Sequence, residues 1–452
     1  MTVYVPSHNY GRYLQQCLDS VFKQLYTNWE LIIVDEGSSD QTSVLAQAAC
    51  LRDPDRVTLL SFPTRIGLQK VANRVLRLAK GKYMMRLDAD DWLDESALLV
   101  MVNKLESLPN AGVVYGNYYY VDEGGTVIGM ERRPALGTED MSGHLPPHGA
   151  CTLFRVRAMR AAGGYLENVR AQDGWDLWFK LYKRVGATSV NVPVFYYRQH
   201  ASSLSRDHAR LLQARTAILR TAGEKLQGDY PLNSVAIIPA KESYPGQEGI
   251  PFREVEGASL LERAITEASG VPEVTAVVVS SSSEAVIAYS QELELSGTVP
   301  PHHRLLKSDS TTSRGLPLLA LMREGSEAFA KATGQKPDIV SFLSLHAFRR
   351  RAIHIEKALS LLRLTESDSV VSVLEEPDPM FRHGPEGLVL MNPGRLAGLT
   401  FERERHYRFN GAIVATWAEI LETGSPFGER IGYIEMSPSD SLQYRGDIVL
   451  GR

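Results

Sequence analysis

The chain has 452 residues, of which 44% are hydrophobic and 23% are charged, and its formal net charge is −4. One hydrophobic core rarely supports that length, so two domains of roughly 200 residues each are expected. The balanced charge gives no electrostatic case for a nucleic-acid partner, and the basic run at 349–351 is expected to be a solvated helix start.

The cysteines and the apolar runs bear on the cellular compartment. Cys17, Cys50 and Cys151 lie far apart without a CxxC pair, which argues against a zinc site or a disulfide framework and favours a reducing cytoplasm. No signal peptide precedes Val3, and no apolar run approaches the roughly 20 residues that cross a bilayer. A cytoplasmic protein is therefore expected, and peripheral association with the inner face of a membrane is left open.

The first half of the chain alternates short apolar runs with helical patterns. The helical spacing of Leu14, Leu18 and Val21 predicts a helix after the first run. Strands are expected at 3–6, 31–35, 57–62, 83–88 and 111–121. This alternation predicts an α/β domain with a mainly parallel sheet, whose ligands bind outside the carboxyl ends of the strands.

The same pattern restarts in the second half. An amphipathic helix and a Gly/Pro break are expected at 206–231. Further strands are expected at 235–241, 274–280, 338–345 and 369–376. The predicted organisation is a first domain at 1–205, a connecting segment at 206–231 and a second α/β domain, also with a mainly parallel sheet, at 232–452.

The stretch YMMRLDADDW places Asp88, Asp90 and Asp91 directly after an expected buried strand. So much negative charge costs folding free energy unless a positive group lies among the carboxylates. Carboxylates at i and i+2 can hold a hard divalent cation, so Asp88 and Asp90 are candidate ligands of Mn²⁺ or Mg²⁺. The alternative is an acidic turn that caps the following helix through Asp91 or Asp94.

Five stretches in order within residues 1–205 resemble family 2 glycosyltransferases, an inverting group with the GT-A fold. They are VPSHNYGRYLQQCLDSVFKQLYTNWELIIVDEGSSDQT, RIGLQKVANRVLRLAKGKYMMRLDADDW, FRVRAMRAAGGYLEN, QDGWDLWFKL and YRQHASSLS. The resemblance implies an enzyme of polysaccharide or glycoconjugate synthesis. Such an enzyme moves a sugar from a nucleotide-diphosphate donor to a glycan or glycoconjugate acceptor, and Asp88 and Asp90 would form its metal-binding DxD motif.

The resemblance also implies a donor pocket. Asp35 and Glu36 would read the nucleoside, and the backbone near Pro6 and Ser7 would line the same pocket. Family members usually carry two aspartates where this chain has Asp35 and Glu36, so a UDP-linked donor is favoured but less firmly implied. Lys70 is a further candidate for donor binding, with a plain helix-surface position as its alternative.

Two more residues take roles from the same resemblance. Asp173 would be the base that deprotonates the acceptor hydroxyl, with an N-cap as the alternative, and Asp176 is expected at the surface. His200 would approach the metal or the diphosphate, and its alternative is a histidine held by a loop network.

Residues 233–452 resemble N-acylneuraminate (CMP-sialate) cytidylyltransferases. The stretches VAIIPAK, SDSTTSRGLPLLAL, SDSVVSVLEEPDPMF, RFNGAIVATWAEIL and GSPFGERIGYIEMSPSDSLQYRGDIVL carry this resemblance. It implies a nucleotide site that includes Lys241, Arg253 and Asn410, and dimerisation through this domain.

This chain differs from the cytidylyltransferases at the acidic residues that bind their metal ion. Gln443 and Arg445 stand where the family has aspartates that hold magnesium, and Asp447 alone remains nearby. A guanidinium cannot bind a metal ion, so a domain without ordinary CTP-dependent activity is expected. Two alternatives stay open: a bifunctional enzyme that activates an acidic ketosugar with CTP, and a non-catalytic module for dimerisation or partner binding.

Overall fold

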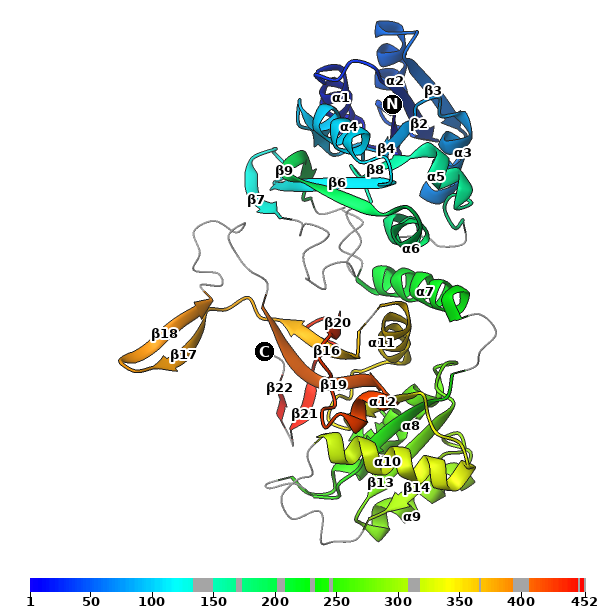
Figure 1. The fold of residues 1–452 in the computed structure, drawn as a ribbon, viewed down its shortest axis with the longest axis vertical. Coiled ribbons are helices and arrows are strands. Elements are labelled where there is room, and N and C mark those ends of the chain that lie inside the picture. Colours follow the sequence, from blue (N-terminus) through cyan, green and yellow to red (C-terminus); the bar gives the residue numbers. More distant parts are fainter. Residues whose placement is uncertain are drawn as a thin grey trace. The chain divides into compact units, whose positions relative to one another are not determined.

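The computed structural model describes residues 1–132, 149–167, 173–200, 208–227, 232–243, 247–307, 318–365, 367–392, 406–445 and 448–450. The chain divides into two compact units (Figure 1). The first is Met1–Ile218 with Asp378–Glu404, and the second is Leu219–Pro377 with Arg405–Arg452. The division falls inside helix α7 (His208–Gln227), which lies where the connecting helix was predicted.

The first unit is built on one mixed sheet. Its strands are β1 (Thr2–Ser7), β2 (Glu30–Glu36), β3 (Val57–Phe62), β4 (Tyr83–Arg86), β5 (Trp92–Leu93), β6 (Val113–Val121), β7 (Val127–Glu131), β8 (Leu153–Arg155) and β9 (Ala187–Arg198). Its helices are α1 (Gly11–Phe22), α2 (Thr42–Arg52), α3 (Leu68–Leu78), α4 (Ala97–Ser107), α5 (Val156–Ala161) and α6 (Asp173–Val185).

The strand order is β3-β2-β1-β4-β8-β6-β9-β5, and β7 pairs with β6. The first four strands of this order run parallel. Strand β8 is antiparallel to both of its neighbours, and β6 is parallel to β9. The prediction of an α/β fold with a mainly parallel sheet is confirmed, although the antiparallel additions were not predicted.

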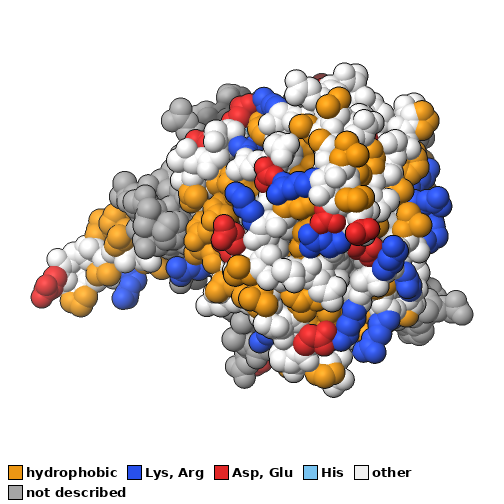
Figure 2. All heavy atoms as spheres, turned by 90° about the horizontal axis from the view of Figure 1, so that it is seen from above, with side chains coloured by type: hydrophobic (Ala, Val, Ile, Leu, Met, Phe, Trp, Pro, Cys, Tyr) orange, Lys and Arg blue, Asp and Glu red, His pale blue; other side chains and the backbone are white. Residues whose placement is uncertain are grey.

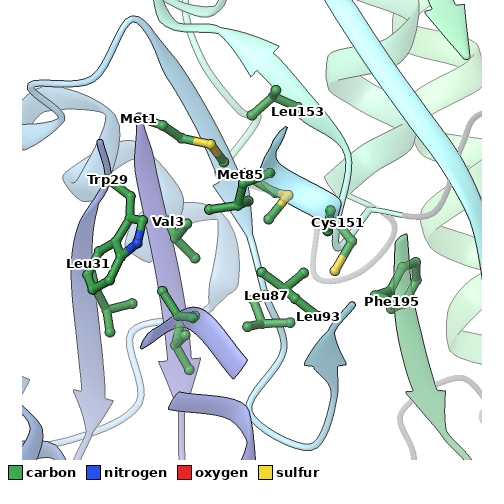
Figure 3. Close-up of a cluster of buried hydrophobic side chains, with 14 of the residues drawn as sticks. Met1, Val3, Trp29, Leu31, Met85, Leu87, Leu93, Cys151, Leu153 and Phe195 are labelled. Carbon is green, nitrogen blue, oxygen red and sulfur yellow. The ribbon is translucent and has the colours of Figure 1, made fainter. Parts of the chain in front are cut away.

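Alternating side chains of the central strands feed two separate cores. On β1, Val3 and Val5 point to one face, where α1 and α4 supply residues such as Leu14 and Met101. Figure 3 shows part of this core, with Val3 near Leu31 and Met85. Tyr4 points to the other face, where helices α3, α5 and α6 pack. Helices therefore cover both faces, and the polar ends of the strands are the part of the sheet left for a site.

The second unit has its own mixed sheet, in the order β14-β13-β10-β15-β19-β16-β20. Its helices are α8 (Leu260–Ser269), α9 (Glu284–Leu295), α10 (Leu318–Thr333), α11 (Ala352–Leu364) and α12 (Ala418–Glu422). The strands of the sheet are β10 (Ser234–Pro239), β13 (Ala276–Ser281), β14 (His303–Leu306), β15 (Ile339–Leu343), β16 (Ser369–Glu375), β19 (Tyr407–Trp417) and β20 (Ile431–Glu435).

The second sheet is again parallel at one side, from β14 to β15, and β19 is antiparallel to both of its neighbours. Helix α10 packs on it through Met322 and Phe329. Smaller elements of this half of the chain are the 3₁₀ turn η3 (Ile250–Phe252) and the pairs β11 (Glu254–Val255) with β12 (Ala258–Ser259), β17 (Met380–Gly384) with β18 (Gly387–Asn392), and β21 (Gln443–Arg445) with β22 (Ile448–Leu450).

The basic run at 349–351 immediately precedes α11, as predicted, but it is not fully solvated. Arg350 is 3% exposed and donates hydrogen bonds to the carbonyls of Ser344 (2.7 Å) and Ala412 (3.2 Å). The prediction was wrong for this residue because a buried guanidinium is stabilised when carbonyl oxygens accept its hydrogen bonds, and two carbonyls do so here.

The surface charge and the helix lengths bear on how the chain meets its surroundings. Acidic and basic side chains are interspersed on the face shown in Figure 2, without separation by sign. Among the helices that the structure describes, none is long and apolar enough to cross a membrane.

Candidate functional site

The carboxyl ends of β1 and β2 lie side by side, because the strands pair in a register that puts Ser7 opposite Asp35. Both residues are 3% exposed. The Asp35 carboxylate accepts hydrogen bonds from the Ser43 hydroxyl and from the Ser38 N–H (3.0 Å). Pro6, one position earlier, is half-buried and pairs with Val34. The predicted residues of this loop are thus brought together, and Asp35 also shapes the turn that follows it.

Glu36 accepts hydrogen bonds from the backbone just before helix α3. One carboxylate oxygen, Oε1, accepts hydrogen bonds from the N–H groups of Ile66 (2.9 Å) and Gly67 (2.8 Å), and the residue is 6% exposed. Lys70 is exposed on the first turn of that helix. The extra methylene of Glu36, compared with aspartate, thus allows the carboxylate to reach the backbone of the neighbouring loop.

The loops after β1 and β2 are locked together by side chains that sequence reasoning missed. Asn9, with a φ of 61°, accepts a hydrogen bond from the Ser39 N–H (2.8 Å). Asp40 accepts from the N–H groups of Gly11 (2.8 Å) and Thr42 (3.0 Å), at the starts of α1 and α2. Burial alone would raise the pKa of Asp40, but these hydrogen bonds outweigh it and lower the pKa below its usual value.

The acidic stretch forms a tight turn after β4. The predicted strand was two residues too long, because β4 ends at Arg86 and the N–H of Asp91 bonds the carbonyl of Asp88 (3.0 Å). Arg86 is only 7% exposed, and its Nε lies 2.9 Å from Asp88 Oδ1. The positive group expected among the carboxylates is therefore already present as an arginine side chain.

His200 joins the same turn from the end of strand β9. Its Nε2 lies 2.8 Å from Asp90 Oδ2, and the His200 side chain is 1% exposed. The rings of Tyr13 and Tyr10 flank the imidazole, with centroids 5.5 and 6.1 Å away. Burial and the nearby Asp90 carboxylate raise the pKa of Tyr10 to about 12.

Asp91 is the buried member of the cluster, at 1% exposure. Its Oδ1 accepts a hydrogen bond from the Arg198 N–H (2.9 Å), whereas Oδ2 has no hydrogen-bond partner in the described part of the chain. Burial is the largest cause that raises the pKa of Asp91 well above its usual range, and repulsion from Asp90 is the second. Asp91 is not a helix cap, because α4 begins six residues later and Asp94 makes the Asx-type bond to the Ser96 N–H (3.0 Å).

Asp173 is the first residue of α6, but its side chain lies outside the described residues. The prediction that Asp176 lies at the surface was wrong. Asp176 is 4% exposed, and its Oδ2 accepts hydrogen bonds from the Leu166 N–H and from Lys180 Nζ, both at 2.8 Å. Asp176 thus ties helix α6 to the preceding loop.

In the second unit, Asn410 is 4% exposed and its side chain is fully engaged by the protein. Its Oδ1 accepts from the Ser372 hydroxyl (2.6 Å), its Nδ2 donates to the Ser441 hydroxyl (3.0 Å), and Gln443 donates to its main-chain carbonyl. Asn410 therefore links β19 and β16 to the segment that precedes β21.

Of the other candidates in the second unit, Arg253 is exposed, with Nε bonded to the Glu248 carbonyl (3.4 Å), and Lys241 is half-buried. The side chain of Arg445, and Asp447 as a whole, lie outside the described residues.

The chemistry of the acidic turn fits a divalent cation. Asp88 and Asp90 keep 28% and 15% of their side chains exposed, and carboxylate oxygens are the ligands that Mg²⁺ and Mn²⁺ prefer. No group of three His, Cys, Asp or Glu side chains converges closely enough to hold a metal ion alone, within the described ranges. A cation here would take its remaining ligands from water or from a bound molecule.

Comparisons with known proteins concern the first unit. The sequence model described as "Glycosyl transferase family 2" matches residues 2–162. Glycosyltransferase GlyG of Streptococcus pneumoniae serotype 4 is 35% identical over 123 residues, which are 27% of this chain and 40% of that protein. Chondroitin synthase of Escherichia coli is 26% identical over 182 residues, which are 40% of this chain and 26% of that protein.

Among solved structures, S. aureus TarS residues 1–349 in complex with UDP-GlcNAc aligns with a TM-score of 0.43 and 17% identity, covering 51% of this chain and 67% of that one. The matched residues span 40% of GlyG and 26% of chondroitin synthase, which is less than half of either relative. The match at residues 2–162 supports a glycosyltransferase domain in the N-terminal part of the chain, as the sequence motifs predicted.

Proposed function

We propose that the chain is a metal-dependent inverting glycosyltransferase. It transfers a sugar from a nucleotide-diphosphate donor, with UDP favoured, to a glycan or glycoconjugate acceptor. The observation that carries this proposal is the meeting of Asp88, Asp90 and His200 at one turn, within a domain matched by the family 2 model. The name of one relative, chondroitin synthase, supports a polysaccharide or glycoconjugate acceptor.

In this proposal Asp88 and Asp90, with His200 behind Asp90, would hold Mn²⁺ or Mg²⁺. The ion supplies positive charge against the diphosphate leaving group. The protein contributes the geometry of the turn, because Arg86 pairs with Asp88 and His200 bonds Asp90. Such preorganisation lowers the reorganisation that donor binding requires.

The donor's nucleoside would lie over the loop of Pro6, Ser7, Asp35 and Glu36. The two loops at this edge are already rigid, since Asp35 and Glu36 accept hydrogen bonds from the backbone of their own loop and of the next. Lys70, exposed on the first turn of α3, is within this proposal a cation for the phosphates. Asp173, at the start of α6, would accept the proton of the attacking hydroxyl.

A thermal-shift screen of the full chain tests the proposal. UDP, GDP, CDP and ADP are each added with Mn²⁺, and again with a chelator in place of the metal. At a ligand concentration of about 100 times Kd, binding adds about 2.7 kcal/mol of stability, and Tm should rise by about 5 °C or more for UDP with Mn²⁺. If no nucleotide diphosphate raises Tm under either condition, the proposal is wrong.

For the second unit, we propose a non-catalytic role. The support is that Asn410 and Gln443 bond each other and other protein groups, so both would have to give up these bonds to serve a nucleotide. The test is incubation of the full chain with CTP, Mg²⁺ and a panel of acidic ketosugars, with detection of pyrophosphate. Release at ordinary enzymatic rates would replace this role with the bifunctional alternative, and release at background level supports it.

A further inference from the structure

Arg198, at the end of β9, makes several hydrogen bonds around the acidic turn. It is 3% exposed, and each guanidinium nitrogen has an acceptor. Nε donates to the Asp90 carbonyl (2.9 Å), Nη1 to the Glu123 carbonyl (2.6 Å) and Nη2 to Gln16 Oε1 (2.6 Å). The three acceptors come from three different segments, so this side chain fixes their relative positions.

Two aromatic rings close the remaining faces of the guanidinium. Its Cζ lies 4.5 Å from the centroid of Tyr13 and 4.8 Å from that of Trp92. These three acceptors are all neutral oxygens, so the side chain acts here through geometry rather than through an ion pair. A lysine could not reproduce this arrangement, because its ammonium is a point charge without the planar fork.

The main chain of Arg198 reaches the same turn a second time, since its N–H donates to Asp91 Oδ1 (2.9 Å). Two residues later, His200 Nε2 meets Asp90 Oδ2 (2.8 Å). The segment from Arg198 to His200 therefore holds the carbonyl and the carboxylate of Asp90, and the carboxylate of Asp91.

We infer that Arg198 is a positioning residue, which fixes the Asp88–Asp90 turn in the geometry that receives the donor diphosphate and its metal. The inference rests on the proposed function. It assigns Arg198 an effect on the affinity for the metal–nucleotide pair, beyond the stability that any buried arginine contributes. Groups that orient metal-binding side chains typically change metal affinity or activity by about 10–100-fold when they are lost.

The chain supplies a matched control in Arg155, the last residue of β8. Arg155 pairs with Tyr83 at the start of β4, whereas the acidic turn follows the end of that strand. Arg155 is 4% exposed, and it donates to the Ala111 carbonyl (2.6 Å), the Tyr83 hydroxyl (3.1 Å) and the Leu105 carbonyl (2.5 Å). The two arginines thus match in burial and in the number of guanidinium nitrogens bonded, but Arg155 bonds no residue of the acidic turn in these contacts.

The experiment compares Arg198→Lys and Arg155→Lys in the full chain by calorimetric titration. The Kd of UDP is measured at saturating Mn²⁺ and that of Mn²⁺ at saturating UDP, together with Tm. Arg198→Lys should weaken both affinities by about tenfold, and Arg155→Lys should lower Tm but keep the wild-type affinities. The inference is wrong if Arg198→Lys retains wild-type affinities, or if both variants weaken binding equally.

A milder pair of variants covers the case in which Arg198→Lys does not fold. Gln16→Met removes one acceptor of the guanidinium from an exposed position of α1 and should weaken UDP–Mn²⁺ binding by about threefold, the worth of one hydrogen bond. Gln15→Met, beside it on the same helix, should change nothing. Unchanged binding in Gln16→Met would contradict the inference. If the wild-type chain binds no nucleotide diphosphate at all, the proposed function itself fails and the inference falls with it.

Discussion

The His200 imidazole and the Asp90 carboxylate lie 2.8 Å apart, although 110 residues separate them in the chain. The contact forms because β9 lies between β6 and β5 in the sheet, and the residues that follow β9 reach the turn after β4. The acidic turn is therefore a tertiary structure whose orientation depends on the far end of the domain. Under the proposed function, metal binding at this turn should depend on the position of β9.

The first prediction concerns Asp90 itself. Asp90→Asn keeps the size of the side chain and a hydrogen-bonding oxygen for His200, but it removes the charge that a divalent cation needs. We expect the Mn²⁺-dependent part of UDP binding to weaken by about a hundredfold, with Tm close to that of the wild type. Calorimetric titration with and without Mn²⁺ measures this.

The control for Asp90→Asn is Asp94→Asn, in the same segment. Asp94 bonds Ser96 in a local turn, so its neutralisation should leave the metal affinity unchanged. Equal losses in the two variants would indicate that charge in this segment, rather than the Asp90 position, supports binding.

The second prediction separates catalysis from binding at helix α6. Asp173→Asn should abolish sugar transfer and leave UDP–Mn²⁺ affinity largely intact, because the base acts on the acceptor hydroxyl alone. Turnover with a radiolabelled donor and titration with UDP report the two properties. Loss of nucleotide binding in a folded variant would contradict the assigned role.

Asp176 gives the matched comparison three positions along the same helix. Asp176→Asn weakens the bonds to Lys180 and to the Leu166 N–H inside the protein, so it should lower the free energy of unfolding by about 2 kcal/mol. Transfer per folded molecule should be retained, which is the reverse of the pattern expected for Asp173→Asn.

Sequence patterns located the strands and the acidic turn well, and the reason is physical. Strands such as β1 and β2 are buried on both faces, so they appear as continuous apolar runs, and parallel strands bring their carboxyl ends to one edge. The antiparallel strand β8 has only three residues and was not predicted. A run that short carries almost no periodicity, and its partners are set by tertiary packing.

The partners of the charged residues could not be predicted from spacing. Arg86, which is buried two residues before Asp88 and pairs with it, already places positive charge beside the acids. Arg198 stood inside the quoted YRQHASSLS stretch, yet only the histidine was singled out there. The signal that could have indicated the arginine is its place at the end of an apolar strand, where a buried guanidinium must find several acceptors.

The third prediction tests the position at which this chain departs from the family pattern. Glu36→Asp restores the family's usual residue, but it shortens the side chain that bonds the N–H groups of Ile66 and Gly67. The loop before α3 should loosen, and UDP affinity should fall by about threefold or more, as expected for the loss of one or two hydrogen bonds. Titration with UDP measures it. Tighter binding would indicate that the carboxylate reads the nucleoside directly.

The last prediction concerns acid stability of the second unit, at the contact between α11 and the segment before β21. His354 Nε2 lies 3.5 Å from Asp440 Oδ2, and the Ser437 hydroxyl donates to the same oxygen (2.9 Å). The hydrogen bond from His354, with that from Ser437, lowers the pKa of Asp440 to about 2. Burial lowers the pKa of His354 below its usual value.

A carboxylate whose folded pKa lies below its unfolded value binds fewer protons in the folded state. Its stabilisation is complete above pH 4 and is lost as the pH falls from about 4 to about 2. The shift corresponds to about 2 kcal/mol, which solvent screening of this partly exposed group reduces to about 1 kcal/mol. A buried neutral histidine acts in the same direction, since the unfolded state takes up its proton first as the pH falls below about 6.5.

Hydrogen exchange of the α11 amides, corrected for intrinsic rates, gives the local stability in wild type, Asp440→Asn and Ser437→Ala. Asp440→Asn should lower it at pH 6, and the difference from wild type should shrink by about 1 kcal/mol as the pH falls from 4 toward 2. Ser437→Ala keeps the titrating carboxylate, so its stability should decrease with acid as in the wild type. Parallel pH profiles for wild type and Asp440→Asn would mean that Asp440 contributes only a hydrogen bond, without linkage to its charge.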